Sequence, residues 1–301
     1  MDIREEIGKI KKEKDAVILA HYYVLPEVQE IADYVGDSFY LSKIAADLQC
    51  KTVVYCGVSF MGESGCLLSP DKAVLMPDIT ADCPMAHMVT EQEVMSAREK
   101  YEDLAVVCYI NSTAEVKSWS DVSVTSANAV KIVRELPNRN ILFVPDRNLG
   151  RFVAAQVPEK NVILVDGYCP IHEKISADEM RRLKEKHPRA LIAVHPECNA
   201  EVTAMADYVG STSGIIAYAA KSSAEEMIIG TEVGVLYELE KQNPGKKFYF
   251  PDTAPVCTDM KLITLEKILH VLKTGDNAAG VTADHAAAAT RTLTRMLELA
   301  K

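Results

Sequence analysis

Short apolar runs, rich in valine, isoleucine and leucine, alternate with helical patterns along the whole chain. The runs lack the strict polar alternation of half-exposed strands, so they predict strands that are buried on both faces. Strands that alternate with helices form crossover connections and parallel sheets. The expected strands fall into three groups: 16–20, 34–37, 52–55 and 73–76; 104–109, 122–125, 140–144 and 161–165; and 190–194, 208–211, 227–230 and 247–250.

Helices are expected between these groups and at the ends of the chain, over residues 3–14, 90–100, 176–186, 261–273 and 283–299. Thr90 and Ser176 are suitable N-cap residues, and a glutamate three positions after each, Glu93 or Glu179, would complete a capping box. The alanine-rich last helix is expected to pack back across the rest of the molecule.

The polar residues within this pattern recur three times. The segments VILAHYYVLPEVQEIADYVGDS, VVCYINSTAEVKSWSDVSVTS and LIAVHPECNAEVTAMADYVGSTS place His21, Tyr109 and His195 at the same position, and we call these three residues the anchors. An aspartate follows each anchor by 12 residues, a hydroxyl side chain by 17 and a cysteine by 60 to 62: Asp33, Ser38 and Cys83; Asp121, Ser126 and Cys169; Asp207, Thr212 and Cys257. The chain is therefore an internal triplication with a period of 86 to 88 residues.

The triplication predicts an α/β fold of three homologous three-layer αβα domains, with small parallel sheets arranged around a pseudo-threefold axis. The expected boundaries are 1–101, 102–187 and 188–301, with the C-terminal helix included in the third domain.

Composition narrows the classes of function. The net charge of −10 provides no clustered basic surface for nucleic acid. No apolar run approaches the 18 or so residues of a membrane span, and the N-terminal stretch is charged and amphipathic rather than a signal peptide. The sequence thus predicts a cytoplasmic protein without a nucleic-acid or membrane partner.

Each repeated polar landmark lies just past the carboxyl end of an expected strand. The anchors follow the first strand of each group, the hydroxyl residues follow the second and the three repeated cysteines follow the fourth. Ligands bind at this edge of open parallel sheets. Three such edges that face one axis would gather all of these side chains around one cavity.

The three repeated cysteines are candidate metal ligands. Eight cysteines in an expected cytoplasmic chain do not indicate a disulfide framework, and Cys83 and Cys169 each precede a proline, as cluster cysteines often do. A four-iron cluster on three thiolates would leave one iron open to substrate. A three-thiolate zinc site, also with an open position, and three inert structural cysteines are the alternatives.

Other repeated residues offer acid, base and hydrogen-bonding chemistry. The hydroxyl residues each precede a helix, where they can serve as N-caps or contribute to an anion site. Glu197 could act as a general base, and Tyr23 and Tyr109 could donate protons or stabilise an oxyanion. Lys221, on the helix after Thr212, is an available cation, although a solvated surface role is its ordinary interpretation.

The motifs AHYYVLPEVQEIADYVGDS, CYINSTAEVK, and AVHPECNAEV with ADYVGSTS, together with the three separated cysteines, resemble the quinolinate synthase family over essentially the whole chain. The resemblance implies a central [4Fe-4S] cluster bound by Cys83, Cys169 and Cys257, with its open iron as a Lewis acid. It implies a transferase of NAD biosynthesis that condenses iminosuccinate (iminoaspartate) with dihydroxyacetone phosphate to quinolinate, phosphate and water. A functional link to an iminoaspartate-producing enzyme follows.

The resemblance also implies roles for individual residues. Tyr23, Tyr109, His195 and Glu197 would be catalytic, with Glu197 as acid and base. The substrate-binding set would be His21, Ser38, Tyr109, Ile110, Asn111, Ser126, His172, His195, Pro196, Glu197, Thr212 and Lys221.

Two other functions stay open on the sequence. One is an iron–sulfur hydro-lyase that acts on a single polycarboxylate and needs no triose phosphate. The other is a metal or redox sensor, which would have no use for His21, Asn111 and Glu197 beside its cluster.

Overall fold

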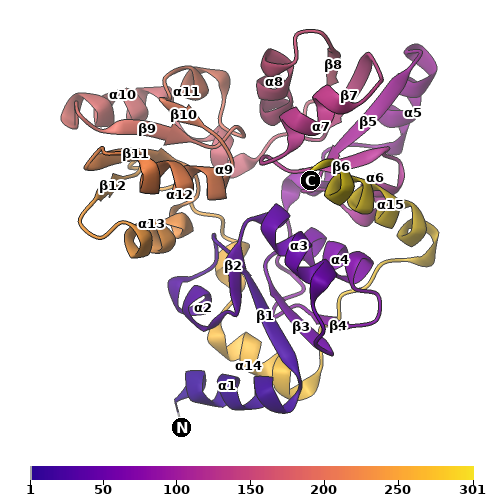
Figure 1. The fold of residues 1–301 in the computed structure, drawn as a ribbon, viewed down its shortest axis with the longest axis vertical. Helices are drawn as coiled ribbons and strands as arrows, with labels where there is room; N and C mark the ends of the chain where they lie inside the picture. Colours follow the sequence, from indigo (N-terminus) through magenta and orange to yellow (C-terminus); the bar gives the residue numbers. More distant parts are fainter. Residues whose placement is uncertain (1) are drawn as a thin grey trace.

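The computed structural model describes residues 2–301 and contains three four-stranded sheets, each entirely parallel (Figure 1). In every sheet the second strand lies at one edge, followed by the first, the third and the fourth. The sheets consist of β1 (Ala16–His21), β2 (Tyr34–Gly36), β3 (Thr52–Cys56) and β4 (Ala73–Leu75); β5 (Leu104–Tyr109), β6 (Val122–Val124), β7 (Asn140–Val144) and β8 (Asn161–Leu164); and β9 (Leu191–Val194), β10 (Tyr208–Val209), β11 (Glu226–Gly230) and β12 (Lys247–Tyr249). These are the three predicted groups, so the expected α/β class is confirmed.

The helices follow the same threefold plan. The first strands lead into α2 (Pro26–Ile31), α6 (Ala114–Ser118) and α11 (Ala200–Ala204), and the second strands into α3 (Ser38–Asp47), α7 (Ala129–Glu135) and α12 (Thr212–Lys221). The third strands lead into α4 (Ser59–Leu68), α8 (Arg147–Gln156) and, after η2 (Val233–Val235), α13 (Leu236–Gln242). After each fourth strand a short turn precedes a longer helix: η1 (Pro84–His87) and α5 (Glu91–Lys100); α9 (Pro170–Glu173) and α10 (Ala177–Lys186); η3 (Met260–Leu262) and α14 (Leu265–Thr274).

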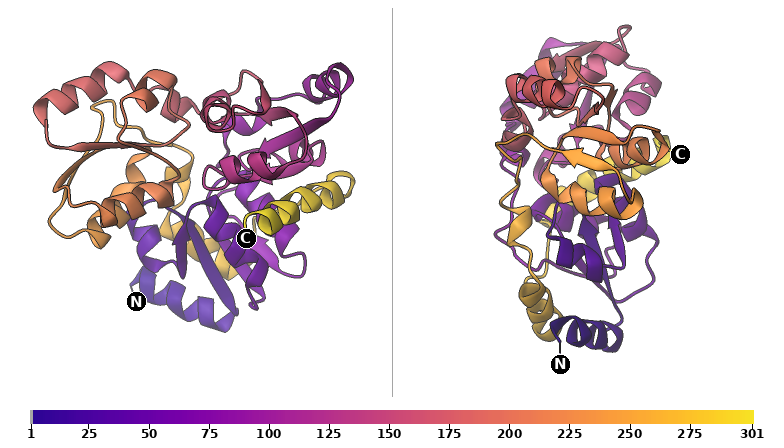
Figure 2. Two further views of the ribbon diagram at one scale, coloured as in Figure 1. Left: turned by 45° about the horizontal axis from the view of Figure 1, so that its top comes forward. Right: turned by 90° about the vertical axis from the view of Figure 1, so that its left-hand side faces the viewer.

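The chain ends cross the boundaries between repeats. Helix α1 (Ile3–Glu13) packs against α14, which thus returns to the first repeat. Helix α15 (Ala283–Leu299) packs against α6 and β6 of the second repeat and α4 of the first, so it runs back across the molecule as expected (Figure 2). The exact domain boundaries at residues 101 and 187 stay a prediction.

The apolar core shows how the repeats are joined. Buried residues of the first and second repeats merge, with those of α14 and α15, into one large cluster. The third sheet instead has a separate cluster on each face, one that includes Ile192 and Ile228 and one that includes Ala193 and Ile229. Successive strand residues point to opposite faces, so each face needs its own helical cover. Within residues 2–301, no helix has both the length and the low polarity required to cross a bilayer.

The repeated aspartates fasten the first strand of each sheet. The Oδ2 atoms of Asp33, Asp121 and Asp207 accept hydrogen bonds from the backbone N–H groups of Ile18, Val106 and Ile192 at 2.8, 2.7 and 2.8 Å. Each aspartate N–H also donates to the carbonyl of the same strand residue. These two hydrogen bonds fix the aspartate to the first strand just before the second strand begins, so the repeated aspartate has a structural role.

Replacing Asp207 with alanine should therefore lower stability without touching the cavity. The N–H of Ile192 loses a charged acceptor, which costs about 1–3 kcal/mol in free energy of unfolding. The melting temperature of the protein should fall by several degrees. Glu201→Ala is the matched control. Glu27, Glu115 and Glu201 also recur, six residues after the anchors, but the side chain of Glu201 is 78% exposed. Equal melting temperatures for the two variants would contradict the structural role of Asp207.

Two helix predictions need correction. The helix expected over 261–273 begins at Leu265, because Thr264 is its N-cap and accepts from the N–H of Lys267. The capping box at Thr90 is present, but Ser176 accepts from Asp178, and the carboxylate of Glu179 binds Thr253.

Candidate active site

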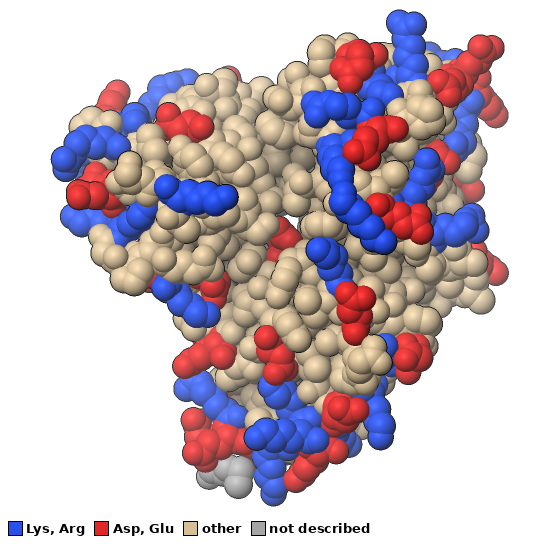
Figure 3. All heavy atoms as spheres, viewed as in Figure 1, with Lys and Arg blue, Asp and Glu red and all other residues tan. Residues whose placement is uncertain are grey.

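A cavity of about 280 Å³ lies where the carboxyl ends of the three sheets meet. Figure 3 shows the surface hollowed between the three lobes, while charged side chains lie mainly on their outer parts. Four threefold sets line the cavity: the anchors His21, Tyr109 and His195; the residues two positions later, Tyr23, Asn111 and Glu197; the hydroxyl residues Ser38, Ser126 and Thr212; and the cysteines Cys83, Cys169 and Cys257. His172 lines it as well.

Three predicted site residues do not line this cavity. Ile110 and Pro196 are buried between lining residues and hold the backbone there. Lys221 is exposed at the last position of α12, whereas Thr212 is the first. A ten-residue helix is about 15 Å long, so the structure does not bring Lys221 to the cavity.

The hydroxyl residues are not N-caps, contrary to their ordinary interpretation. Asp37 and Ser211 cap α3 and α12, and Ser38 and Thr212 are the first residues inside those helices. The hydroxyls are thus available to other partners: Thr212 Oγ1 lies 2.7 Å from the Tyr23 hydroxyl, and Ser126 Oγ lies 3.1 Å from His195 Nε2.

Both anchor histidines have a defined tautomer. The backbone N–H of Tyr23 donates to Nδ1 of His21 at 3.2 Å, and that of Glu197 donates to Nδ1 of His195 at 3.3 Å. An imidazole nitrogen that accepts carries no proton, so in the neutral ring Nε2 carries it. For His195 this Nε2–H donates to Ser126. Burial lowers the pKa of each histidine to about 3, so both are neutral N–H donors near pH 7.

These lowered pKa values predict acid sensitivity. Below pH 6.5 the unfolded chain protonates both histidines while the folded chain does not, so stability is complete above pH 6.5 and falls as pH drops towards 3. At pH 5.5 each histidine should account for roughly 1.4 kcal/mol of lost stability. The melting temperature should therefore drop between pH 6.5 and 4.5, and His21→Gln should flatten that drop. The exposed His270, replaced in the same way, is the control; equal slopes for all three proteins would contradict the assignment.

A hydrogen-bonded chain links residues of all three repeats. The Tyr23 hydroxyl lies 2.7 Å from Thr231 Oγ1, which lies 2.9 Å from Nε2 of His172. Nδ1 of His172 lies 2.7 Å from a carboxylate oxygen of Glu197. The path can shift a proton between the tyrosine and the carboxylate through a histidine.

Ionisation states along this chain differ. Burial alone would raise the pKa of Glu197, but His172, whose Nδ1 lies 2.7 Å from the carboxylate, outweighs it and lowers that pKa, so the carboxylate is ionised. Burial, reinforced by Glu197, raises the pKa values of Tyr23 and Tyr109 well above their ordinary value. The site therefore pairs proton-donating phenols with one proton-accepting carboxylate.

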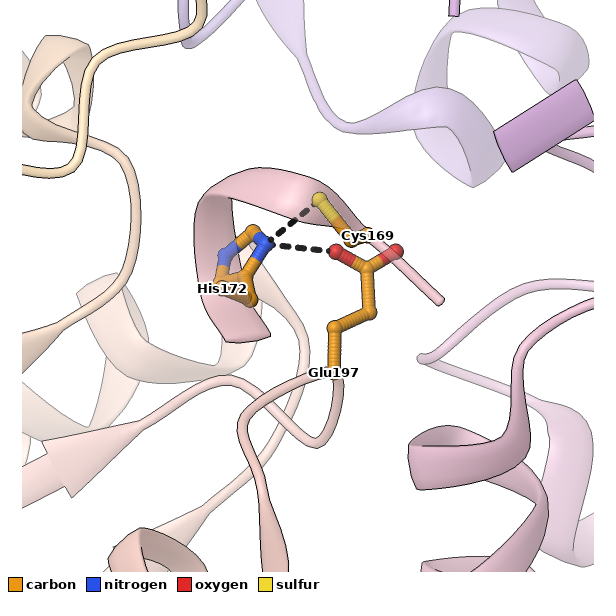
Figure 4. A group of neighbouring side chains, drawn as sticks. All are labelled: Cys169, His172 and Glu197. Atoms are coloured by element: carbon orange, nitrogen blue, oxygen red, sulfur yellow. Dashed lines mark hydrogen bonds and ion pairs between the residues drawn. The ribbon is translucent and has the colours of Figure 1, made fainter. Parts of the chain in front are cut away.

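Cys169, His172 and Glu197 form a compact donor group (Figure 4). Their ligand atoms lie within 4.8 Å of one another, and Nδ1 of His172 lies 3.2 Å from the Cys169 sulfur. Cys169 directly precedes the single turn of α9, so Cys169 and His172 lie on the same side of it. Oε1 of Glu197 has no hydrogen-bond partner within the described residues.

The three cysteines suit a multinuclear metal centre. A tetrahedral zinc with Zn–S bonds of about 2.3 Å needs its sulfurs roughly 3.8 Å apart. Across residues 2–301, no group that includes all three cysteine sulfurs lies within 4.8 Å. As they stand, the three sulfurs are too far apart to share one tetrahedral zinc ion. Burial raises the pKa of Cys257 to about 11, and raises those of Cys83 and Cys169 too, so a bound cation is what would hold them as thiolates.

The sequence argument missed the residues after the third strands. The positions 37 residues after the anchors are Val58, Asp146 and Glu232. Val58 and Glu232 line the cavity, and Asp146 is fully buried close to it. Thr231, beside Glu232, completes the hydrogen-bonded chain. The same repeat arithmetic that found the cysteines would have found these positions.

The described lining of the cavity contains more acidic than basic side chains, so most of its hydrogen-bond donors are neutral. Its described lining includes several carboxylates and one basic residue: Asp37, Asp82, Glu197, Glu232, Asp259 and Lys174. Against these charges stand the Nε2–H groups of the anchor histidines, the hydroxyls of the repeats and the N-termini of α3 and α12. Backbone N–H groups at a helix N-terminus favour carboxylate or phosphate. The arrangement suits a small polyanion.

Known proteins resemble this chain throughout its length. The family model for quinolinate synthetase A protein matches residues 5–298. The quinolinate synthase of Caldicellulosiruptor saccharolyticus is 52% identical over 297 residues, which cover 99% of this chain and 98% of its own. That of Clostridioides difficile is 51% identical over 300 residues, covering 100% and 99%, and that of Fusobacterium nucleatum is 52% identical over 298 residues, covering 99% of each.

Proposed function

This chain belongs to the quinolinate synthase A family, enzymes of NAD biosynthesis, and we propose that it condenses iminosuccinate with dihydroxyacetone phosphate to give quinolinate, phosphate and water. One observation carries the proposal. Three cysteines, two neutral imidazoles, two phenols and an ionised carboxylate share one cavity that draws on all three repeats. A sensor would not need this acid–base equipment beside its metal centre.

Cys83, Cys169 and Cys257 would hold a [4Fe-4S] cluster with one open iron. When bound, such a cluster supplies a Lewis acid that polarises a substrate oxygen or nitrogen. All three cysteines line the cavity, and burial raises the pKa of each thiol, so a bound cationic centre would be needed to hold them as thiolates; both observations fit a group of that kind.

Substrate binding would rest on the neutral donors. The N–H group of His21, the amide of Asn111 and the hydroxyl of Ser126, which the Nε2–H of His195 orients, would bind the two carboxylates of iminosuccinate. The first turns of α3 and α12, which begin with Ser38 and Thr212, would accept the triose phosphate.

Proton transfer would use the hydrogen-bonded chain. Tyr23, a protonated phenol, would donate to a leaving or developing oxygen, and Glu197 would take a proton from substrate carbon or nitrogen. His172, between Thr231 and Glu197, can return the proton to Tyr23 through Thr231. Tyr109, near the Glu197 carboxylate, would stabilise a developing oxyanion. The iminosuccinate would come from an iminoaspartate-producing enzyme.

The test uses anaerobically purified and reconstituted protein. Iron and sulfide should each be present at about four per chain, as expected for one [4Fe-4S] cluster. Quinolinate should form only when iminosuccinate and dihydroxyacetone phosphate are both supplied. Turnover of one dicarboxylate without the triose would favour a hydro-lyase, and a cluster with no turnover of either would favour a sensor. Zinc at one per chain in place of iron would overturn the proposed cofactor.

A further inference from the structure

Glu232, which is buried, and Lys261, which is half-buried, form an ion pair that holds the backbone of Cys257. Oε1 of Glu232 lies 2.8 Å from Nζ of Lys261 and accepts the backbone N–H of Cys257 at 3.0 Å. The backbone N–H of Lys261 in turn donates to the Cys257 carbonyl at 3.3 Å. Both polar groups of the cysteine backbone are therefore fixed by one pair of residues.

The same pair contacts the loop that carries Tyr23. Nζ of Lys261 donates a hydrogen bond to the backbone carbonyl of Tyr23. The other Glu232 oxygen, Oε2, accepts from the N–H of Gly234 at 2.6 Å. A Cβ atom on Gly234 would lie 2.8 Å from Tyr23 Cα and 2.9 Å from the Tyr22 carbonyl, so the two backbones are in direct contact.

This junction combines hydrogen bonds with apolar packing. Tyr23, Met260 and Ile263 all belong to the large apolar cluster, so the Tyr23 loop and the segment after Cys257 also meet through apolar contacts. The third sheet has its own core clusters, and Tyr22 of the first repeat packs against one of them.

Nε2 of Gln29 spans the junction: it donates to the carbonyls of Tyr22, Val24 and Gly234 at 2.9, 3.1 and 3.0 Å. Hydrogen bonds, which are directional, therefore act together with apolar contacts to fix the relative placement of the first and third repeats here.

We propose that the Glu232–Lys261 pair, hereafter the clasp, is a positioning device that fixes the Cys257 loop and the Tyr23 loop relative to each other. The inference rests on the proposed function, in which Cys257 holds the cluster and Tyr23 moves a proton. Neither clasp residue needs to touch substrate. The clasp couples the placement of a metal ligand to that of a proton donor 234 positions away in the chain (257 − 23 = 234).

Thiol reactivity in the cluster-free protein tests the clasp without any turnover. The measured quantity is the rate at which N-ethylmaleimide modifies Cys257 divided by the rate at which it modifies Cys169. In Glu232→Gln and Lys261→Met this ratio should rise about tenfold, the scale on which contacts to metal-ligating residues act. Peptide mass spectrometry over time gives this ratio. The matched controls are Glu238→Gln and Lys241→Met, because these residues form an ion pair of the same 2.8 Å length in the same repeat, outside the cavity. Both controls should leave the ratio within about twofold of the native value.

Kinetics of the reconstituted enzyme then separate positioning from substrate binding. We expect kcat to fall about 10- to 100-fold in the clasp variants. The KM values for both substrates should stay within about threefold, because uniform substrate binding is untouched.

Lys261 is the more easily replaced of the two residues, because its side chain is 21% exposed. An unchanged thiol ratio in Lys261→Met would therefore overturn the proposal even if Glu232→Gln fails to fold. A wild-type protein that forms no quinolinate would contradict the proposed function. The thiol ratio would still test the positioning role of the clasp, because it is measured without turnover.

Discussion

Replacing Cys83, Cys169 or Cys257 with alanine is expected to abolish quinolinate formation and to remove most of the iron from the reconstituted protein. Each substitution would leave only two of the three proposed thiolate ligands for the cluster. The rate should fall by at least about 10³-fold, the loss that follows removal of a principal electrostatic stabiliser. Iron and sulfide content, visible absorption and the rate of quinolinate formation measure the effect.

Cys50 and Cys198 are the controls for these substitutions. Cys50 is half-buried, like the three repeated cysteines, but it lies outside the cavity, and Cys198 is buried beside Glu197 in the chain. Their alanine variants should keep iron and activity. Full iron content in Cys257→Ala would mean that the cysteines do not act as a set. Iron loss confined to variants of Cys169, His172 and Glu197 would move the metal to that compact group.

Replacing Glu197 with glutamine should lower kcat by about 10²- to 10⁴-fold, the usual contribution of a general acid or base. Glutamine keeps the size of the side chain, but it cannot take up a proton. It also removes the charge that holds the proton on Nδ1 of His172, so the path to Tyr23 is cut at one end. Cluster content should be unchanged, because the carboxylate is not one of the three proposed ligands. Single-turnover rates with measured iron content separate the chemical step from cofactor loss.

Glu201→Gln provides the comparison for Glu197→Gln. Glu201 lies four residues further along the same repeat and is exposed, so its variant should retain native kinetics. A drop in iron content for Glu197→Gln in parallel with the rate would show that Glu197 supports the metal centre rather than moving a proton. A KM increase with unchanged kcat would assign it to substrate binding alone.

The repeat made the fold predictable. Three sets of landmarks at equal spacing located all three sheets, because equivalent residues in a triplicated chain occupy equivalent places. Sequence could not give the order of the strands. In the observed order the first and third strands are neighbours, and the chain leaves them in opposite directions. The site therefore extends to the end of the third strand, where Thr231 and Glu232 lie.

Equal spacing along the chain predicted which residues occupy equivalent places, but it could not predict which of them contact the cavity. Asp33, Asp121 and Asp207 recur as faithfully as the cysteines, yet they hold strands together at a distance from the cavity. A residue can therefore recur in every repeat because it supports the common fold, and not only because it takes part in the chemistry.

Glu179 and Lys221 were assigned from local sequence alone, and the structure places both elsewhere. Glu179 was expected in a capping box, but its carboxylate binds Thr253. Lys221 was a candidate cation for the site, but it lies at the far end of α12 and is exposed.

The positions two residues after the anchors bear on how such a chain could evolve. Tyr23, Asn111 and Glu197 occupy equivalent places and converge on one small space. A homotrimer of a single unit would have to put the same side chain at all three, and three glutamates there would repel one another and could not all ionise. Fusion of the units into one gene lifts that restriction. Each copy can then mutate alone, so a symmetric ancestor could become an asymmetric catalyst without changing its scaffold.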